Sequence, residues 1–163
     1  MKLETLRDLY IEQLQDIYSA ETQIIEALPK IIDAVSSEDL KDGLENHLKE
    51  TQQQVQRLEQ ILKDLDANPK GQKCKGMKGL LDEGAELLAE DAEPEVLDAG
   101  IIASCQRVEH YEIAAYGTVR NYAQLLGHQE HAQLLTQTLN EEKQADETLS
   151  EAAEEINVEA KAA

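Results

Sequence analysis

Four segments of the chain carry apolar residues at helical spacing, and side chains of types that bind metals interrupt the apolar face of each. These side chains are Glu21, His47, Glu50, Glu109, Glu112, Glu142 and Asp146. The last six form three pairs whose members are three or four residues apart. Residues at that spacing lie on one face of a helix about one turn apart, so each pair can point at the same place in the interior.

Metal binding is the chemistry that this pattern favours. Burying about six carboxylates together is prohibitively costly unless their charge is compensated, and a pair of divalent cations would compensate it. Oxygen-rich sites with one or two histidines suit iron or manganese rather than a structural zinc held by thiolates. We therefore predict two divalent metal ions as cofactors, iron first and manganese as the alternative, held by these seven residues.

Simpler explanations exist for each residue taken alone. A single carboxylate in such a position more often lies at the exposed edge of its helix, and Glu50 sits at the border of its apolar stripe. A lone His47 would more often be a hydrogen-bonded core histidine than a ligand. The signal is the coincidence of four segments, each interrupted near its middle.

Other side chains near these segments leave alternatives open. His110 follows Glu109 and points roughly 100° away from it, either as a ligand or as the partner of one. Tyr18 and Tyr116 suit hydrogen bonds to ligand carboxylates, but packing at the edge of the core explains them equally well. His128 and His131 open the last segment beside a loop, and we interpret them as surface residues.

The elements that must position these residues are all helices. We expect long helices over residues 3–35, 37–66, 94–126 and 128–156, and a short one over residues 79–90. Pro29 should kink the first helix or split off its end, and the residues after 156 should fray. Very short connections make two antiparallel hairpins, and residues 67–93 are long enough to travel the length of the bundle between them. The predicted fold is a single all-α domain over 1–163, a four-helix bundle with one long crossover, which is the ferritin-like connectivity.

Composition narrows the range of partners. The chain has 163 residues, 41% of them hydrophobic, with no Phe or Trp and a formal net charge of -19. An acidic surface repels phosphate backbones and anionic lipids, so we expect neither nucleic-acid nor membrane binding. No apolar run approaches the roughly 18 residues of a membrane span. The two cysteines, Cys74 and Cys105, do not suggest a disulfide framework, and we expect a cytoplasmic protein.

The sequence also resembles a known family along nearly its whole length. Residues 108–117, from Val108 to Gly117, look like the signature of the bacterial YciF/YciE family of ferritin-like proteins. Further similar motifs are Asp16, residues 18–21, 47–51 and 73–77, and Glu141 to Lys143. The resemblance implies a ferritin-like bundle, a homodimer, and a cytoplasmic protein linked to stress responses.

A more distant similarity to rubrerythrins concerns the metal ligands. It matches Glu109 and Glu112 to the Glu-x-x-Glu of their third helix, and Glu142, with Asp146 as a further candidate, to the ligands of their fourth. In the second helix rubrerythrins and ferritins carry Glu-x-x-His, whereas this chain has the reversed order, His47 before Glu50.

Two functions remain in competition. The first is a di-metal protein for stress-related redox chemistry or metal handling, which leaves open an oxidase or peroxidase type of activity. The second is a non-catalytic structural or interaction stress protein that keeps the same scaffold.

Overall fold

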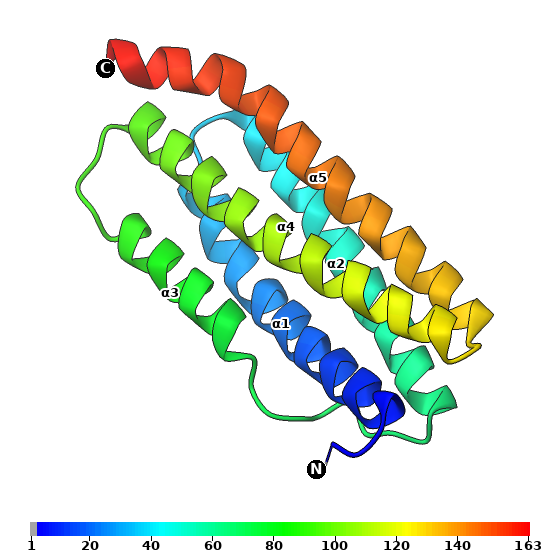
Figure 1. Cartoon of the computed structure of the whole chain (residues 1–163). Helices are drawn as coiled ribbons and strands as arrows, with labels where there is room; N and C mark the ends of the chain where they lie inside the picture. Colours follow the sequence, from blue (N-terminus) through cyan, green and yellow to red (C-terminus); the bar gives the residue numbers. More distant parts are fainter. Residues whose placement is uncertain (1–2) are drawn as a thin grey trace.

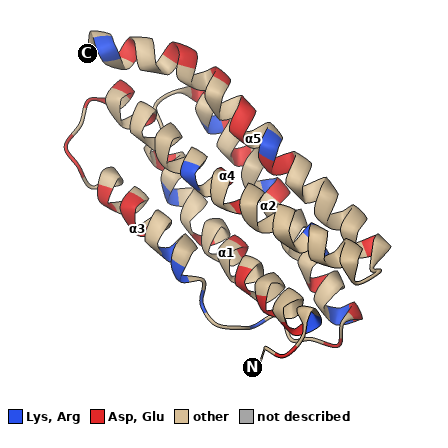
Figure 2. Cartoon of the chain, in the orientation of Figure 1, with Lys and Arg blue, Asp and Glu red and all other residues tan. Residues whose placement is uncertain are grey.

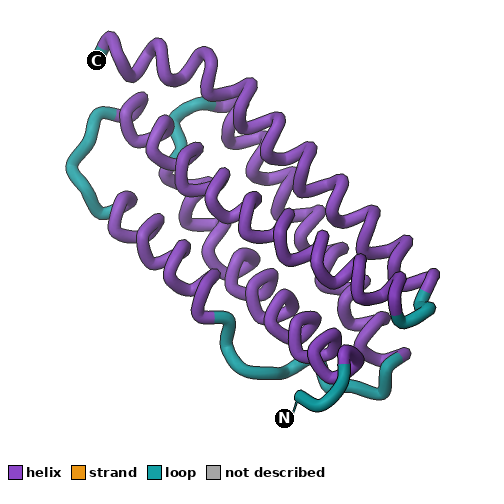
Figure 3. Tube along the Cα trace, viewed as in Figure 1, coloured by secondary structure: helices purple, strands orange, loops and turns teal. Residues whose placement is uncertain are grey.

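The computed structural model describes residues 3–163, and every regular element in this range is a helix (Figures 1 and 3). The helices are α1 (Leu6–Ala34), α2 (Glu38–Asp64), α3 (Lys75–Leu88), α4 (Pro94–Leu125) and α5 (Gln129–Ala162). Helix α1 packs on α2 and α4, and α5 packs on α4 and α2. The four long helices therefore form a bundle, and α3 lies outside it against α1 and α4.

Two tight turns make the helical hairpins. In the turn between α1 and α2, Ser37 caps α2, because its side chain accepts a hydrogen bond from the backbone N–H of Leu40 at 3.3 Å. In the turn between α4 and α5, Gly127 has φ +80°, a left-handed conformation that favours glycine after a helix end. The connections predicted to be short are short, and each joins antiparallel neighbours (Figure 1).

The buried carboxylate of Asp98, near the start of α4, holds the first of these turns in place. It accepts hydrogen bonds from the backbone N–H of Ser36 at 3.0 Å, from the Ser36 hydroxyl at 2.6 Å and from the backbone N–H of Ser37 at 2.8 Å. Three bonds to one buried carboxylate tie the two hairpins together at this end of the bundle.

The long crossover runs between the end of α2 and the start of α4, at opposite ends of the bundle, so α2 and α4 run parallel (Figure 1). This arrangement confirms the predicted ferritin-like fold with its extra helix. Helix α3 begins four residues earlier than predicted, because the Cys74 thiol caps it and accepts from the backbone N–H of Met77 at 3.4 Å. Gln23 of α1 also donates to the Cys74 carbonyl at 3.1 Å, which fixes this cap against the bundle.

Two other helices differ from the sequence prediction. Helix α1 continues through Pro29 to Ala34 instead of splitting there. Leu28 and Ile32 are buried on either side of the proline, and this packing offsets the hydrogen bond that proline removes. Helix α5 continues to Ala162, because Ile156 packs into the core and the last residues are good helix formers.

The apolar core is divided into two clusters along the bundle axis. One fills the end that contains the α1–α2 turn and the buried side of α3, and includes Ile24 and Val108. The other fills the opposite end and includes Ile17 and Val119. Between the two clusters, the long helices place buried polar side chains instead of apolar ones.

Acidic residues occur along all the helices (Figure 2), in keeping with the net charge of -19. Within residues 3–163, no helix combines the length and hydropathy that crossing a membrane requires.

Candidate metal centre

Four side chains from three helices meet in the polar layer between the two apolar clusters. His47 comes from α2, Glu109 and Glu112 from α4, and Glu142 from α5. Each offers one possible ligand atom, and these four atoms all lie within 4.8 Å of one another. All four residues are buried, with 7% or less of their surface exposed. The structure thus places four of the seven predicted ligands in one group, which we call the metal cluster.

Burial sets the protonation states within the metal cluster. Burial lowers the pKa of His47 to about 4, which keeps its imidazole neutral, the form that can bind a metal. Its Nε2 lies 3.3 Å from Oε1 of Glu109. Burial and the neighbouring carboxylates raise the pKa of Glu109 and Glu112 well above the ordinary value, and burial raises that of Glu142 to about 7. The carboxyls therefore resist ionising together without a nearby positive charge.

Glu21 of α1 adds a fifth buried carboxyl beside the metal cluster. Burial, followed by the charge of Glu142, raises its pKa to about 8. The Tyr116 hydroxyl from α4 donates a hydrogen bond to Oε1 of Glu21. Of the two tyrosines considered from the sequence, Tyr116 thus contacts a predicted ligand, whereas Tyr18 donates to Glu59 at 3.1 Å on the outside of the bundle.

The layer contains an unusual number of buried polar atoms without a hydrogen-bond partner. They are Oε2 of Glu21, Oε2 of Glu109, both carboxyl oxygens of Glu112 and Glu142, and Nδ1 of His47. Leaving such atoms without a partner costs free energy at each of them. Divalent cations would satisfy the oxygens, and a set of carboxylate oxygens with one imidazole matches what iron and manganese accept. The residues present therefore fit the predicted metals.

Glu50 and Asp146 lie at the edges of this arrangement rather than within the group of four. Glu50 is partly exposed and accepts a hydrogen bond from Asn46 at 3.3 Å. Asp146 contacts His110 and Gln106, with Nε2 of His110 3.3 Å from one carboxyl oxygen and Nε2 of Gln106 3.2 Å from the other. Spacing alone does not separate them from the group, because Glu112 lies three residues after Glu109 and both belong to it. Glu50 and Asp146 instead contact side chains outside the group.

A second polar group beside the metal cluster was missed in the sequence. Arg57 of α2 makes a bidentate ion pair with Glu141 of α5 at 2.6 and 2.8 Å, and the buried Gln54 donates to the same carboxylate at 3.2 Å. Although burial opposes it, hydrogen bonding to Arg57 lowers the pKa of Glu141. Gln54 follows His47 by two helical turns, so heptad spacing was the signal that could have found it.

The histidines outside the metal cluster have other roles. The imidazole of His110 is largely exposed and pairs with Asp146. The surface interpretation of His131 is wrong, since only 6% of its surface is exposed. Tyr10 of α1 covers it, with the phenol oxygen 3.5 Å from Nδ1, and Asp64 lies 3.5 Å from Nε2. Tyr10 lies far from His131 in the sequence, so the position of His131 beside a loop could not indicate that it is buried.

Two cavities border the metal cluster. The larger, of about 270 Å³, lies between α1, α3 and α4 and reaches His47 and Glu109. The smaller, of about 120 Å³, lies between α2 and α5, reaches the same two residues, and has Glu50 in its wall.

Comparison with known proteins gives matches over almost the whole chain. The model of a family described as "Domain of unknown function (DUF892)" matches residues 5–162. Protein YciF of Escherichia coli (strain K12) is 42% identical over 154 residues, which cover 94% of this chain and 93% of that protein.

Two solved structures are also similar. The crystal structure of the E. coli stress protein YciF has a TM-score of 0.91 at 41% identity, covering 94% of this chain and 98% of that one. YcfI, a proposed structural protein from Rhodopseudomonas palustris, has a TM-score of 0.88 at 47% identity, covering 91% and 95%.

Proposed function

We propose that this chain, which belongs to the DUF892 family, binds two divalent metal ions in its polar layer, iron in preference to manganese. In this role it would serve redox chemistry or metal handling under stress. The observation that carries the proposal is the set of buried carboxyl oxygens and one imidazole nitrogen without hydrogen-bond partners. Within residues 3–163, no lysine or arginine donates to these atoms, so a bound cation is the charge that would make this layer stable.

The residues that would hold the ions come from all four long helices. His47, Glu109, Glu112 and Glu142 supply one compact group of donor atoms. Glu21 stands next to Glu112 and Glu142 and extends the group towards α1, and its carboxyl oxygens would be donors for the second ion. Iron or manganese with open coordination positions supplies electron transfer to oxygen or peroxide when it is bound.

The chain's own contribution is to prepare these donors. The two apolar clusters border the layer on both sides along the bundle axis. Burial keeps His47 neutral, so its ring needs no deprotonation before it binds. The carboxyls have raised pKa values, so ion binding near neutral pH would release protons from them. Tyr116 orients Glu21 through its hydroxyl.

Metal content of the purified protein tests the proposal. We expect native expression to yield about two iron or manganese ions per chain, and we expect the double variant Glu109→Gln/Glu142→Gln to lose them. Glutamine keeps the shape of glutamate but removes its charge. Glu147→Gln, an exposed change on α5, is the matched control and should retain the metals. Full metal retention by the double variant would contradict the proposal.

The second candidate is a structural or interaction protein without turnover, and the description of YcfI as a proposed structural protein favours it. The same preparations separate the two functions. A folded wild type that binds metal, but neither oxidises ferrous ion nor consumes peroxide, would support the structural role.

The biological setting is also part of the proposal. The similar E. coli protein is called a stress protein, and we extend that setting to this chain. Both cysteines are free and buried, and burial raises the pKa of Cys105 to about 12, which suits inert thiols in a reducing cytoplasm. We also propose a homodimer, which light scattering on a sizing column would test.

A further inference from the structure

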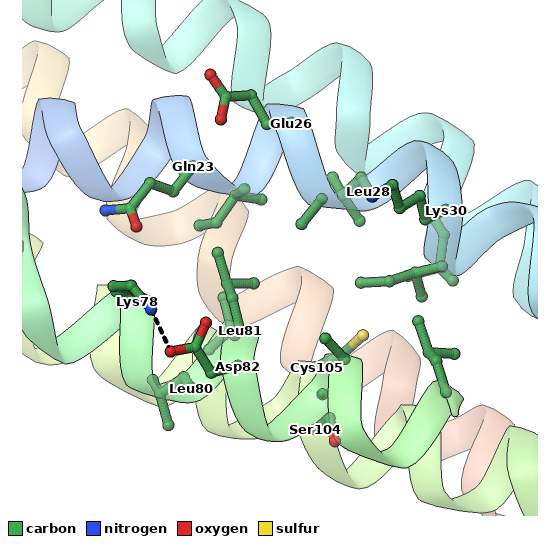
Figure 4. A pocket seen from close by; sticks show the side chains of 18 of the residues that line it. Gln23, Glu26, Leu28, Lys30, Lys78, Leu80, Leu81, Asp82, Ser104 and Cys105 are labelled. Atoms are coloured by element: carbon green, nitrogen blue, oxygen red, sulfur yellow. Dashed lines mark hydrogen bonds and ion pairs between the residues drawn. The ribbon is translucent and has the colours of Figure 1, made fainter. Parts of the chain in front are cut away.

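The larger cavity is a second feature of the centre that calls for an occupant. It lies between α1, α3 and α4, and its inner end is formed by His47 and Glu109 of the metal cluster. Most of its wall surface is apolar, and the aliphatic residues in it include Ile24, Leu28, Leu44, Leu81, Leu88 and Val108. Figure 4 shows Leu81 of α3 projecting towards α1 across this space.

Helix α3 covers the cavity without filling it. Met77 is its only buried residue, whereas Leu80, Leu81 and Leu88 are only partly buried, although they form its apolar face. An amphipathic helix normally buries that face in close contact with its neighbours. Here the leucines border open space instead, so the cavity offers apolar surface to a guest.

Charge around the cavity indicates what kind of guest fits. The lysines in the wall are Lys30, Lys73 and Lys78, and the acidic residues are Glu26, Asp82 and Glu109. Lys78 and Asp82 form an ion pair with each other at the side of the cavity (Figure 4). Basic and acidic residues are equal in number in this wall, and the inner end borders the carboxyl-rich metal cluster. This balance favours neither an anion nor a cation.

We propose that this cavity binds one small, uncharged and largely apolar organic molecule per chain, with its inner end beside His47 and Glu109. The volume of about 270 Å³ is just below the usual range for drug-sized ligands, which limits the guest to a smaller molecule. We also propose that this molecule is the substrate of the metal centre, and that role rests on the proposed function. The binding of the molecule in the cavity does not depend on the metal site.

A change that fills the cavity gives the sharpest test. A side chain added at Gly84, in the α3 wall, would meet only Cβ of Ser104 at 3.9 Å, an ordinary contact. Gly84→Leu can therefore add its Cβ without strain and extend a side chain from the cavity wall, and it also replaces a poor helix former. Gly79→Leu is the matched control, because Gly79 is exposed on the same helix, outside the cavity wall, with nothing within 4 Å.

The neutral fluorophore 1-aminoanthracene is the probe, used with the metal-free full chain. We expect saturable binding of one probe per chain in the wild type and in Gly79→Leu, and at least tenfold weaker binding in Gly84→Leu. Ser104→Leu, which fills the cavity from α4, should repeat the loss if Gly84→Leu folds poorly. Absence of binding to the wild type, or equal binding by the filled variants, would overturn the proposal.

A cobalt titration tests the position beside the metal cluster. The absorption spectrum of bound Co²⁺ should shift when the probe is added to the wild type or Gly79→Leu, and should stay constant in Gly84→Leu. A probe that binds without shifting the spectrum of bound cobalt would overturn the placement beside His47 and Glu109. Failure of cobalt to bind would count against the metal site alone, because the fluorescence of the metal-free protein still measures the cavity.

Discussion

Tyr116 is the residue on which the geometry of Glu21 depends. Its side chain is fully buried, and its hydroxyl donates to the one Glu21 oxygen that has a hydrogen-bond partner. Partners of this kind orient a metal ligand and hold it in place before the metal arrives.

Tyr116→Phe should therefore weaken metal binding while leaving the fold intact. We expect a loss of about tenfold in affinity, which is typical when a partner of a ligand is removed. Anaerobic calorimetric titration with Mn²⁺ or Fe²⁺ measures it. Tyr18→Phe is the control, because that hydroxyl contacts the exposed side of the bundle. Equal affinities in the two variants would show that Tyr116 does not position Glu21.

At the same scale, some members of the buried polar group could be predicted from the sequence and others could not. Glu109, Glu112, Glu142 and His47 stood out because each interrupts an apolar stripe, and burial places all four together. Residue spacing gives a direction only to within part of a turn. It therefore could not separate Glu142, deep in the layer, from Asp146, which pairs with His110 nearer the surface.

At the scale of elements, periodicity predicted the long helices and the connection lengths predicted how they are joined. It could not predict the start of α3, because a thiol is an uncommon helix cap and the Cys74 cap also depends on Gln23 of α1. Pro29 does not split α1, because its neighbours Leu28 and Ile32 pack in the core. In both cases contacts between helices, which local sequence does not reveal, determine where the helix begins or continues.

The link between the hairpins through Asp98 leads to a prediction about stability. Asp98→Ala removes three hydrogen bonds to the α1–α2 turn and leaves the N–H groups of Ser36 and Ser37 without this partner. We expect a loss of about 3 kcal/mol in the free energy of unfolding, measured in urea. Glu93→Ala, at the exposed cap of α4 without a side-chain cap bond, should change it little. A comparable loss in both variants would contradict the role of Asp98.

At the scale of the whole molecule, the metal cluster should make the metal-free protein less stable as pH rises. The folded state raises the pKa of Glu142 to about 7 and that of Glu21 to about 8, so it holds protons that the unfolded chain has already released. The contribution of these two carboxyls to the free energy of unfolding is complete below about pH 4.5, the ordinary pKa of a glutamate side chain. It is lost as the pH rises to about 8. His47 acts in the opposite sense, between about pH 4 and 6.5.

The clearest window is therefore pH 6.5 to 8, where His47 no longer titrates. Metal-free protein should unfold at a lower urea concentration at pH 8 than at pH 6.5. The variant Glu109→Gln/Glu142→Gln should show a weaker dependence, because two of the raised groups are gone. A midpoint that rises with pH in the metal-free wild type would contradict the assignment of protonated carboxyls to the layer.

The division of the apolar core by the polar layer affects how long the protein survives proteolysis in the cell. Each end of the bundle keeps its own apolar packing, and the layer between them is formed by polar side chains, many of whose buried atoms have no hydrogen-bond partner. Without ions, one end could open while the other stays closed, and the open end would be accessible to proteases. Bound ions would join the ends into a single cooperative unit. Loaded chains would then outlive empty ones, and the lifetime of the protein would follow the supply of metal, which limited proteolysis with and without Mn²⁺ would detect.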